Sequence, residues 1–232
     1  MDKIIIVAID GPAGAGKSTI ARTVAERLGF LYIDTGAMYR AIALWALRTG
    51  TALDDMHRLE TLAVSADLEL IGPGRIKLNG EDVSEAIRER AVSEAASKVA
   101  VVAGVRRALV EKQQRFAEST SVVMEGRDIG TVVFPEAQVK FYLDASPQVR
   151  ADRRALELTE RGQDVALEEL VREIEDRDRR DRARAHSPLR QAEDAVYLDT
   201  TRLTPVEVED EILRVVRART SNGKSLTRQH VE

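Results

Sequence analysis

The chain has 232 residues, enough for one large domain with a sizeable buried core. Its formal net charge of −4 at pH 7 provides no general basic field that would hold it on nucleic acid or on an anionic membrane, so any anion site has to be local. Cysteine is absent, which excludes a disulfide framework, a cysteine-ligated zinc site and thiol catalysis.

Five short apolar runs predict β-strands. The first, residues 4–9, is continuously apolar and rich in β-branched side chains, as in a strand that is covered on both faces of a parallel sheet. The other four runs are residues 30–33, 121–124, 139–143 and 195–198. Segments of helical length or periodicity separate the runs, and this alternation predicts an α/β core with a parallel five-stranded sheet flanked by helices.

A glycine-rich motif follows the first strand directly. Residues 11–18 match the pattern G-x-x-x-x-G-K-S and precede an apolar-periodic helix. Glycines let the backbone turn its N–H groups toward phosphate oxygens, while Lys17 would reach the β- and γ-phosphates of ATP and Ser18 would bind Mg²⁺. The predicted ATP-binding residues are Gly11, Pro12, Ala13, Gly14, Ala15, Gly16, Lys17, Ser18 and Thr19. The alternative is a chance glycine turn, which is expected in about one chain of this length in a hundred.

Two segments interrupt the regular alternation. Between residues 41 and 104, residues 68–71 and 75–80 flank a Gly-Pro-Gly turn and predict a small antiparallel hairpin, inserted into the core. Residues 147–185 are helical and heavily charged, but glycine and polar residues at 160–164 predict a break. We expect two helices joined by a mobile tip, which would form a hinged lid.

The arginines favour a kinase over other P-loop proteins. The phosphate loop alone does not separate kinases from GTPases or motor ATPases. The chain lacks the Asn/Thr-Lys-x-Asp motif with which GTPases read guanine, and it carries arginines at loops and helix starts. Many cationic donors suit phosphoryl transfer between two phosphorylated substrates, because they neutralise the charge of the transferring group.

An arginine-rich run near the end of the chain has two interpretations. Residues 172–184 hold six arginines and five acids, a net charge of +1 that is too balanced for a nucleic-acid footprint. A solvated helix held by internal ion pairs is the simpler interpretation. However, Arg177, Asp181 and Arg184 are spaced i, i+4, i+7 and share one helix face, with the acid between two guanidiniums. A carboxylate in that arrangement can fix both arginines and still accept a hydrogen bond from a sugar hydroxyl.

Several further motifs carry a family resemblance. They are residues 34–40 (DTGAMYR), 95–100 (AASKVA), 105–109 (VRRAL), 126–135 (GRDIGTVVFP) and 177–184 (RDRRDRAR). Together with the phosphate loop they resemble bacterial cytidylate kinases over nearly the whole chain except the tail. The resemblance implies transfer of the ATP γ-phosphoryl group to CMP, and to dCMP, with Mg²⁺. It also implies a P-loop kinase core, a monophosphate-binding insertion with a small antiparallel sheet, and a short helical lid.

The resemblance also implies residue roles. Arg40 and Arg127 would hold the CMP phosphate, while Ser97, Arg106 and Asp128 would read cytosine. A carboxylate suits this last task, because cytosine donates from its N4 amine whereas uracil has a carbonyl there that would repel it. Asp128 could instead cap the segment that follows it, and Ser97 could be only a small helix residue.

The predicted site sets follow from these assignments. The CMP-binding set is Thr35, Arg40, Ser97, Arg106, Arg127, Asp128, Arg177 and Asp181. The catalytic set is Lys17, Arg127, Arg177 and Arg184, and Ser18 is the predicted Mg²⁺ ligand. Two positions depart from the family pattern: Thr35 replaces serine, and Glu125 stands where aspartate is frequent, which leaves the role of Glu125 in Mg²⁺ binding open.

We divide the chain into six segments. They are core with phosphate loop (1–38), monophosphate-binding insertion (39–103), core (104–152), lid (153–176), core (177–219) and a tail expected to lack order (220–232). The expected partners are ATP and CMP or dCMP, without nucleic acid or membrane, and we expect a cytoplasmic monomer. Another small-molecule P-loop kinase, of the UMP/CMP, adenylate or shikimate type, is the nearest alternative. A P-loop ATPase switch acting on a macromolecule is the alternative from another class.

Overall fold

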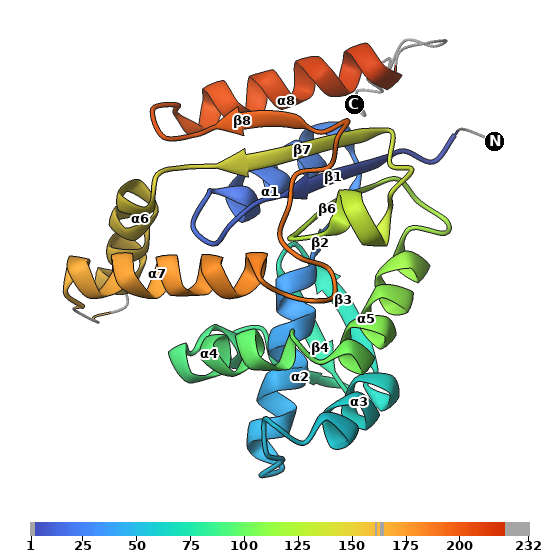
Figure 1. The fold of residues 1–232 in the computed structure, drawn as a ribbon. Coiled ribbons are helices and arrows are strands. Elements are labelled where there is room, and N and C mark those ends of the chain that lie inside the picture. The colour runs from blue at the N-terminus through green and yellow to red at the C-terminus, as the bar shows by residue number, and fades with distance from the viewer. Residues whose placement is uncertain (1–2, 161, 163–164, 221–232) are drawn as a thin grey trace.

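A computed structural model describes residues 3–160, 162 and 165–220 of the chain. Within this part, five parallel strands form one sheet in the order β2-β6-β1-β7-β8 (Figure 1). Its strands are β1 (Ile6–Asp10), β2 (Leu31–Asp34), β6 (Val122–Gly126), β7 (Val139–Asp144) and β8 (Val196–Asp199). All five predicted strands and the parallel α/β fold are confirmed. The predicted tail, apart from Thr220, lies outside the described residues.

The strands end later than the apolar pattern predicted. β1 begins at Ile6 rather than at residue 4, and it continues to Asp10. Three other strands also end in aspartate, at Asp34, Asp144 and Asp199. An aspartate does not extend an apolar pattern, but its backbone can still pair with the neighbouring strand. Polar side chains are therefore gathered at the carboxyl edge of the sheet, where doubly wound folds bind ligands.

Helices and a tight turn cover the two faces of this sheet. Helices α1 (Lys17–Leu28) and α8 (Pro205–Thr220) pack together on one face, with Ile20 and Ile212 in their shared apolar core. The other face packs against a π-helical turn, Ile129–Val133, and against the end of α5 (Ala103–Phe116). None of the helices described here is long and apolar enough to cross a membrane.

The segment between β2 and β6 forms a second body with its own core, below the sheet in Figure 1. Its helices are α2 (Thr35–Arg48), α3 (Met56–Ser65), a short 3-10 turn (Ala86–Arg88), α4 (Arg90–Val99) and α5. The predicted hairpin is present, but the described sheet has a third strand: β3 (Leu68–Gly72), β4 (Arg75–Leu78) and β5 (Glu81–Asp82). Two exposed residues are too few to show alternation, although the left-handed Asn79-Gly80 turn is a strong hairpin signal.

The charged stretch before β8 forms two helices, as predicted. They are α6 (Pro147–Thr159) and α7 (Leu167–Arg182), seen at the left of Figure 1. Ser146 caps α6 by accepting a hydrogen bond from the Val149 backbone N–H at 3.3 Å. A small separate cluster of apolar residues holds the two helices together; its buried members are Ala151, Leu158, Leu170 and Ile174.

Candidate active site

The phosphate loop connects β1 to α1 and folds back over the sheet. At Gly11, with a φ of 147°, an added Cβ would lie 1.9 Å from the Leu143 carbonyl oxygen, so this close approach requires glycine. Lys17 begins α1, is 5% exposed, and donates from Nζ to the Pro12 carbonyl oxygen at 2.6 Å. Burial, followed by the charge of Arg127, lowers the pKa of Lys17, while Glu125 opposes the shift. The lysine thus lies inside the loop, where phosphate oxygens would meet it.

Glu125 connects the first turn of α1 to β2. One carboxylate oxygen of this buried residue accepts from Ser18 Oγ at 3.0 Å, and the other accepts from Tyr32 Oη. Burial and then the negative charge of Asp34 raise the pKa of Glu125. Within the described residues no group of three His, Cys, Asp or Glu side chains is placed to hold a metal. A hydroxyl beside a carboxylate nevertheless suits Mg²⁺, which takes few protein ligands and keeps water and phosphate oxygens.

Three arginines lie close to Asp181 and act on its charge. Asp181 is 1% exposed; its two carboxylate oxygens accept from Arg127 Nε at 3.1 Å and from the guanidinium of Arg184. Burial opposes ionisation, but Arg127, Arg184 and Arg177 together lower the pKa of Asp181. The helix-face interpretation of the sequence is therefore corrected. The acid does lie between two guanidiniums, but Arg127 takes the place that was expected for Arg177, and Arg184 follows the end of α7.

Arg177 and Arg40 complete this basic cluster. The buried Nε of Arg177 has no hydrogen-bond partner among the described residues, and burial, with Arg127 next, lowers the Arg177 pKa to about 10. Arg40 donates from Nη2 to Asp34 at 2.8 Å, and its Nε is also buried without a partner in the part of the chain that is described. Buried guanidinium donors without acceptors are costly. The cluster is therefore suited to an anion with several acceptor oxygens.

Two of the three residues expected to read the base, Arg106 and Asp128, lie together beside Arg184 of this cluster. Arg106 and Asp128 form an ion pair in which both side chains are buried. Arg106 also donates to the Ala100 carbonyl oxygen at 3.2 Å and lies over the Tyr39 ring, 5.4 Å from its centroid. The side chain of Asp128 makes no cap to the following turn, so the capping alternative is wrong. Asp10 provides that cap instead.

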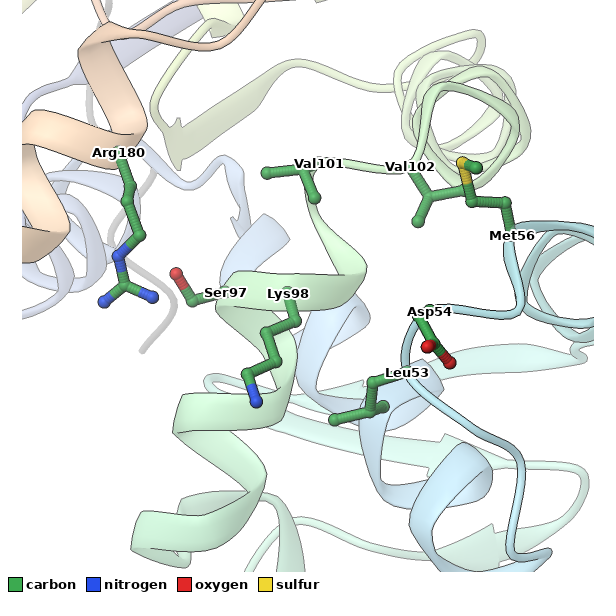
Figure 2. Close-up of a pocket in the computed structure, with 8 residues that line it drawn as sticks. All are labelled: Leu53, Asp54, Met56, Ser97, Lys98, Val101, Val102 and Arg180. Atoms are coloured by element: carbon green, nitrogen blue, oxygen red, sulfur yellow. The ribbon is translucent and has the colours of Figure 1, made fainter.

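Ser97 is placed differently from a plain helix residue. It is 8% exposed, and its Oγ has no hydrogen-bond partner in the described part of the chain. Figure 2 shows its hydroxyl on α4 pointing toward Arg180 of α7, beside a cavity of about 560 Å³. The cavity is lined by Leu53, Asp54, Met56, Ser97, Lys98, Val101, Val102 and Arg180. A buried hydroxyl without a partner is available to a ligand.

Thr35, by contrast, is turned into the protein. It is buried, and its Oγ1 donates to the Glu125 backbone carbonyl oxygen at 2.6 Å. Three residues of the site were given no role in the sequence analysis: Asp10, Tyr32 and Tyr39. Asp10 could have been found most readily from the sequence, because it is a carboxylate between an apolar strand and a phosphate loop. The two tyrosines read as ordinary strand and helix residues.

Taken together, a parallel α/β core, a phosphate loop at its carboxyl edge and a facing cluster of arginines define a P-loop kinase. The chain belongs to the cytidylate kinase family, whose sequence model, described as Cytidylate kinase, matches residues 7–218.

Individual relatives agree with this placement. A protein named Cytidylate kinase from Solibacter usitatus (strain Ellin6076) is 59% identical over 97% of this chain and 97% of its own length. Another of the same name, from Geobacter sp. (strain M21), is 48% identical over 94% of this chain and 95% of its own length. Among solved structures, a gluconokinase from Sinorhizobium meliloti 1021 superposes with a TM-score of 0.50, covering 93% of each chain at 13% identity. That likeness concerns the fold alone.

Proposed function

We propose that this enzyme transfers the γ-phosphoryl group of ATP to CMP and dCMP, giving CDP or dCDP and ADP. The observation that carries the proposal is the buried Arg106–Asp128 pair beside the arginine cluster. Asp128 can accept from the N4 amine of cytosine, and Arg106 can donate to its O2 and N3 edge. Uracil would present a carbonyl to the carboxylate, which is unfavourable. The names of the relatives support the same substrate.

Catalysis would rest on positioning and charge neutralisation, without a covalent enzyme intermediate. Lys17 would hold the β- and γ-phosphates of ATP. Arg40 and Arg127 would hold the phosphate of CMP, while Arg177 and Arg184 would neutralise charge on the transferring group. The partnerless Nε atoms of Arg40 and Arg177 support these roles, because an anion would supply the acceptors that the described residues lack.

Mg²⁺ is part of the proposal. Ser18 would hold the ion together with the phosphates of ATP, and Glu125, which already accepts from Ser18, would act on it through water. The bound ion would supply positive charge that offsets the negative charge of the ATP phosphates. Ser97 would contribute its free hydroxyl to the cytosine edge, and Asp181 would accept from the ribose.

We further propose that residues 39–103 form the monophosphate-binding insertion and that the α6–α7 hairpin, centred on residues 153–176, closes as a lid. Arg90, at the start of α4, pairs with Glu169 and Glu173 of α7, so the hairpin is in contact with the insertion, as a lid over the monophosphate site would be. A closed hairpin would exclude water that otherwise hydrolyses ATP. The monomeric state, the cytoplasmic location and the absence of a nucleic-acid partner stay predictions.

A single assay tests the proposed function. Release of ADP from MgATP is measured with CMP, dCMP, UMP, AMP, GMP and shikimate as acceptors. We expect the highest kcat/KM with CMP or dCMP, and a loss of about 100-fold or more in Lys17→Ala, since one preorganised charge is removed. A different preferred acceptor would replace the proposal with another small-molecule kinase. ATP turnover that responds only to a macromolecule would favour an ATPase switch.

A further inference from the structure

Asp10 joins the phosphate loop to the turn that carries Arg127 and Asp128. It is the last residue of β1, directly before Gly11, and is 4% exposed. One carboxylate oxygen accepts from the Ile129 backbone N–H and the other from the Gly130 backbone N–H, both at 2.8 Å. These two N–H groups open the π-helical turn that follows the Arg-Asp dipeptide. The carboxylate of Asp10 therefore fastens the start of the π-helical turn to the start of the phosphate loop.

The surrounding backbone leaves this turn little freedom. Asp10 is paired in register with Gly126 in the parallel ladder, so the turn leaves β6 beside the phosphate loop. An added Cβ at Gly126 would lie 2.6 Å from Ile129 Cδ1 and 2.8 Å from Thr35 Oγ1, which shows how closely the turn packs. The ladder fixes the end of β6, and Asp10 fixes the turn. The directions of the two side chains between them, Arg127 and Asp128, are therefore set.

The charge of Asp10 is expensive to bury. Burial, with a smaller contribution from Asp128, raises the pKa of Asp10 to about 7. The two backbone N–H groups and the charge of Lys17 act in the opposite direction and lower it. Lys17 faces it from α1 and Asp128 from the turn, while the Lys140 side chain of β7 lies against Gly130 and its ammonium pairs with Asp194. An apolar residue would avoid this cost, so the two hydrogen bonds are the feature that the carboxylate provides.

We propose that Asp10 is a positioning residue for specificity. It holds Arg127 and Asp128 at a set distance from the phosphate loop, so that the γ-phosphoryl group of ATP and the phosphate of CMP meet in line. The inference rests on the proposed function. Asp10 touches neither substrate and acts through the turn. Displacement of Asp128 weakens cytosine reading more than it weakens reaction with UMP, which Asp128 does not favour.

Asp10→Asn tests the inference with little change in volume. The amide keeps one acceptor oxygen but turns an NH₂ toward a backbone N–H, so one of the two hydrogen bonds is lost. We expect kcat/KM for CMP to fall about 10- to 100-fold, because small displacements of positioned groups are costly in phosphoryl transfer. For UMP the fall is smaller, so the CMP:UMP ratio of kcat/KM decreases.

The matched control is Gln138→Ala. Gln138 Oε1 accepts from the Ile6 backbone N–H at 2.8 Å, so it anchors the opposite end of the same strand. We expect this variant to lower Tm and leave the CMP:UMP ratio unchanged.

The wild-type pH profile gives a second readout that needs no folded variant. The ratio should fall as Asp10 is protonated toward about pH 6, and titration of the substrate phosphate, common to both nucleotides, cancels in it.

The outcomes separate the two proposals. A reduced CMP:UMP ratio in Asp10→Asn, together with a wild-type ratio that depends on pH, supports the positioning role. An unchanged ratio in Asp10→Asn, or a flat wild-type profile if that variant does not fold, overturns the inference while the proposed function stands. A wild-type enzyme that does not prefer CMP over UMP overturns both.

Discussion

Arg106 and Asp128 form an ion pair in which the two side chains are only 5% and 6% exposed. Each buried side chain holds the other in place, so the pair fixes the positions of the two groups proposed to read cytosine. A second pair, Arg150 with Asp178, is equally buried, with side chains 2% and 6% exposed and a 2.7 Å contact. The second pair joins α6 to α7 beside the phosphate loop, whose Ala13 carbonyl oxygen also accepts from Arg150. It provides a matched reference for the first.

Asp128→Asn should erode the preference for CMP over UMP. The amide can donate as well as accept, so it no longer repels the uracil carbonyl. Because Arg106 loses its charged partner inside the protein, we also expect a loss of stability of about 3–5 kcal/mol at most. Asp178→Asn should cost a similar amount of stability and leave the CMP:UMP ratio of kcat/KM unchanged. Equal ratios in wild type and Asp128→Asn would remove Asp128 from base recognition.

Asp181→Ala should reduce turnover of both cytidine nucleotides. The substitution frees Arg127 and Arg184 and removes a proposed acceptor for the ribose. A charged hydrogen bond is worth about 1.5–3 kcal/mol, or roughly 10- to 150-fold in kcat/KM. A larger fall for CMP than for dCMP indicates contact with the 2′-hydroxyl, and equal falls indicate that Asp181 chiefly positions the arginines.

Asp176→Ala is the control for this prediction. Asp176 lies on the same helix and pairs with Arg179 at 2.9 Å, with both side chains exposed. Exposed pairs contribute little, so kcat/KM and Tm should both stay close to wild type. If kcat/KM in Asp181→Ala stays as close to wild type as in Asp176→Ala, Asp181 has no part in the reaction and the sugar assignment is wrong.

Tyr32→Phe should raise the Mg²⁺ concentration needed for half-maximal activity. Tyr32 Oη donates to Glu125, whose other oxygen accepts from Ser18. Without that hydroxyl the carboxylate is less well placed, and a hydrogen bond worth about 1 kcal/mol corresponds to roughly a fivefold change. Mg²⁺ titrations at saturating ATP and CMP measure the effect. Tyr197→Phe, at a half-exposed tyrosine of β8, should not change the titration. An unaltered Mg²⁺ response in Tyr32→Phe would contradict the role of Glu125.

Binding of ATP should be accompanied by proton uptake. Burial and the charges of Arg127 and Arg177 lower the pKa of Lys17. The phosphates bring negative charge beside Nζ and raise that pKa, so at about pH 8 the lysine binds a proton as ATP binds. Calorimetric titrations in buffers with different ionisation enthalpies measure the uptake. Lys17→Arg, which stays protonated, should show less uptake, and equal uptake would assign the proton to another group.

Local sequence determined the strands and the phosphate loop. Continuous apolar runs bounded by polar residues are sufficient to specify buried parallel strands, and the glycine motif between a strand and a helix specifies the loop. The break between α6 and α7 was also readable, since glycine and polar residues interrupt an otherwise helical stretch. β5 was missed because two exposed residues cannot show the alternation of apolar and polar side chains that marks a strand. The Asn79-Gly80 turn before it was nevertheless a signal for a hairpin.

Tertiary structure decided which of the charged residues meet. Helix spacing correctly placed Asp181 between two guanidiniums, but it could not reveal that one belongs to Arg127, which lies 54 residues away in the chain. Likewise, the contact between Asp10 and the Gly130 N–H spans 120 residues. Periodicity describes neighbours on one helix or strand, whereas the sheet order places β1 beside β6 and brings α7 over their carboxyl ends. Partners joined by those packing contacts leave no local pattern, and so the acids that orient this site were decided by the fold.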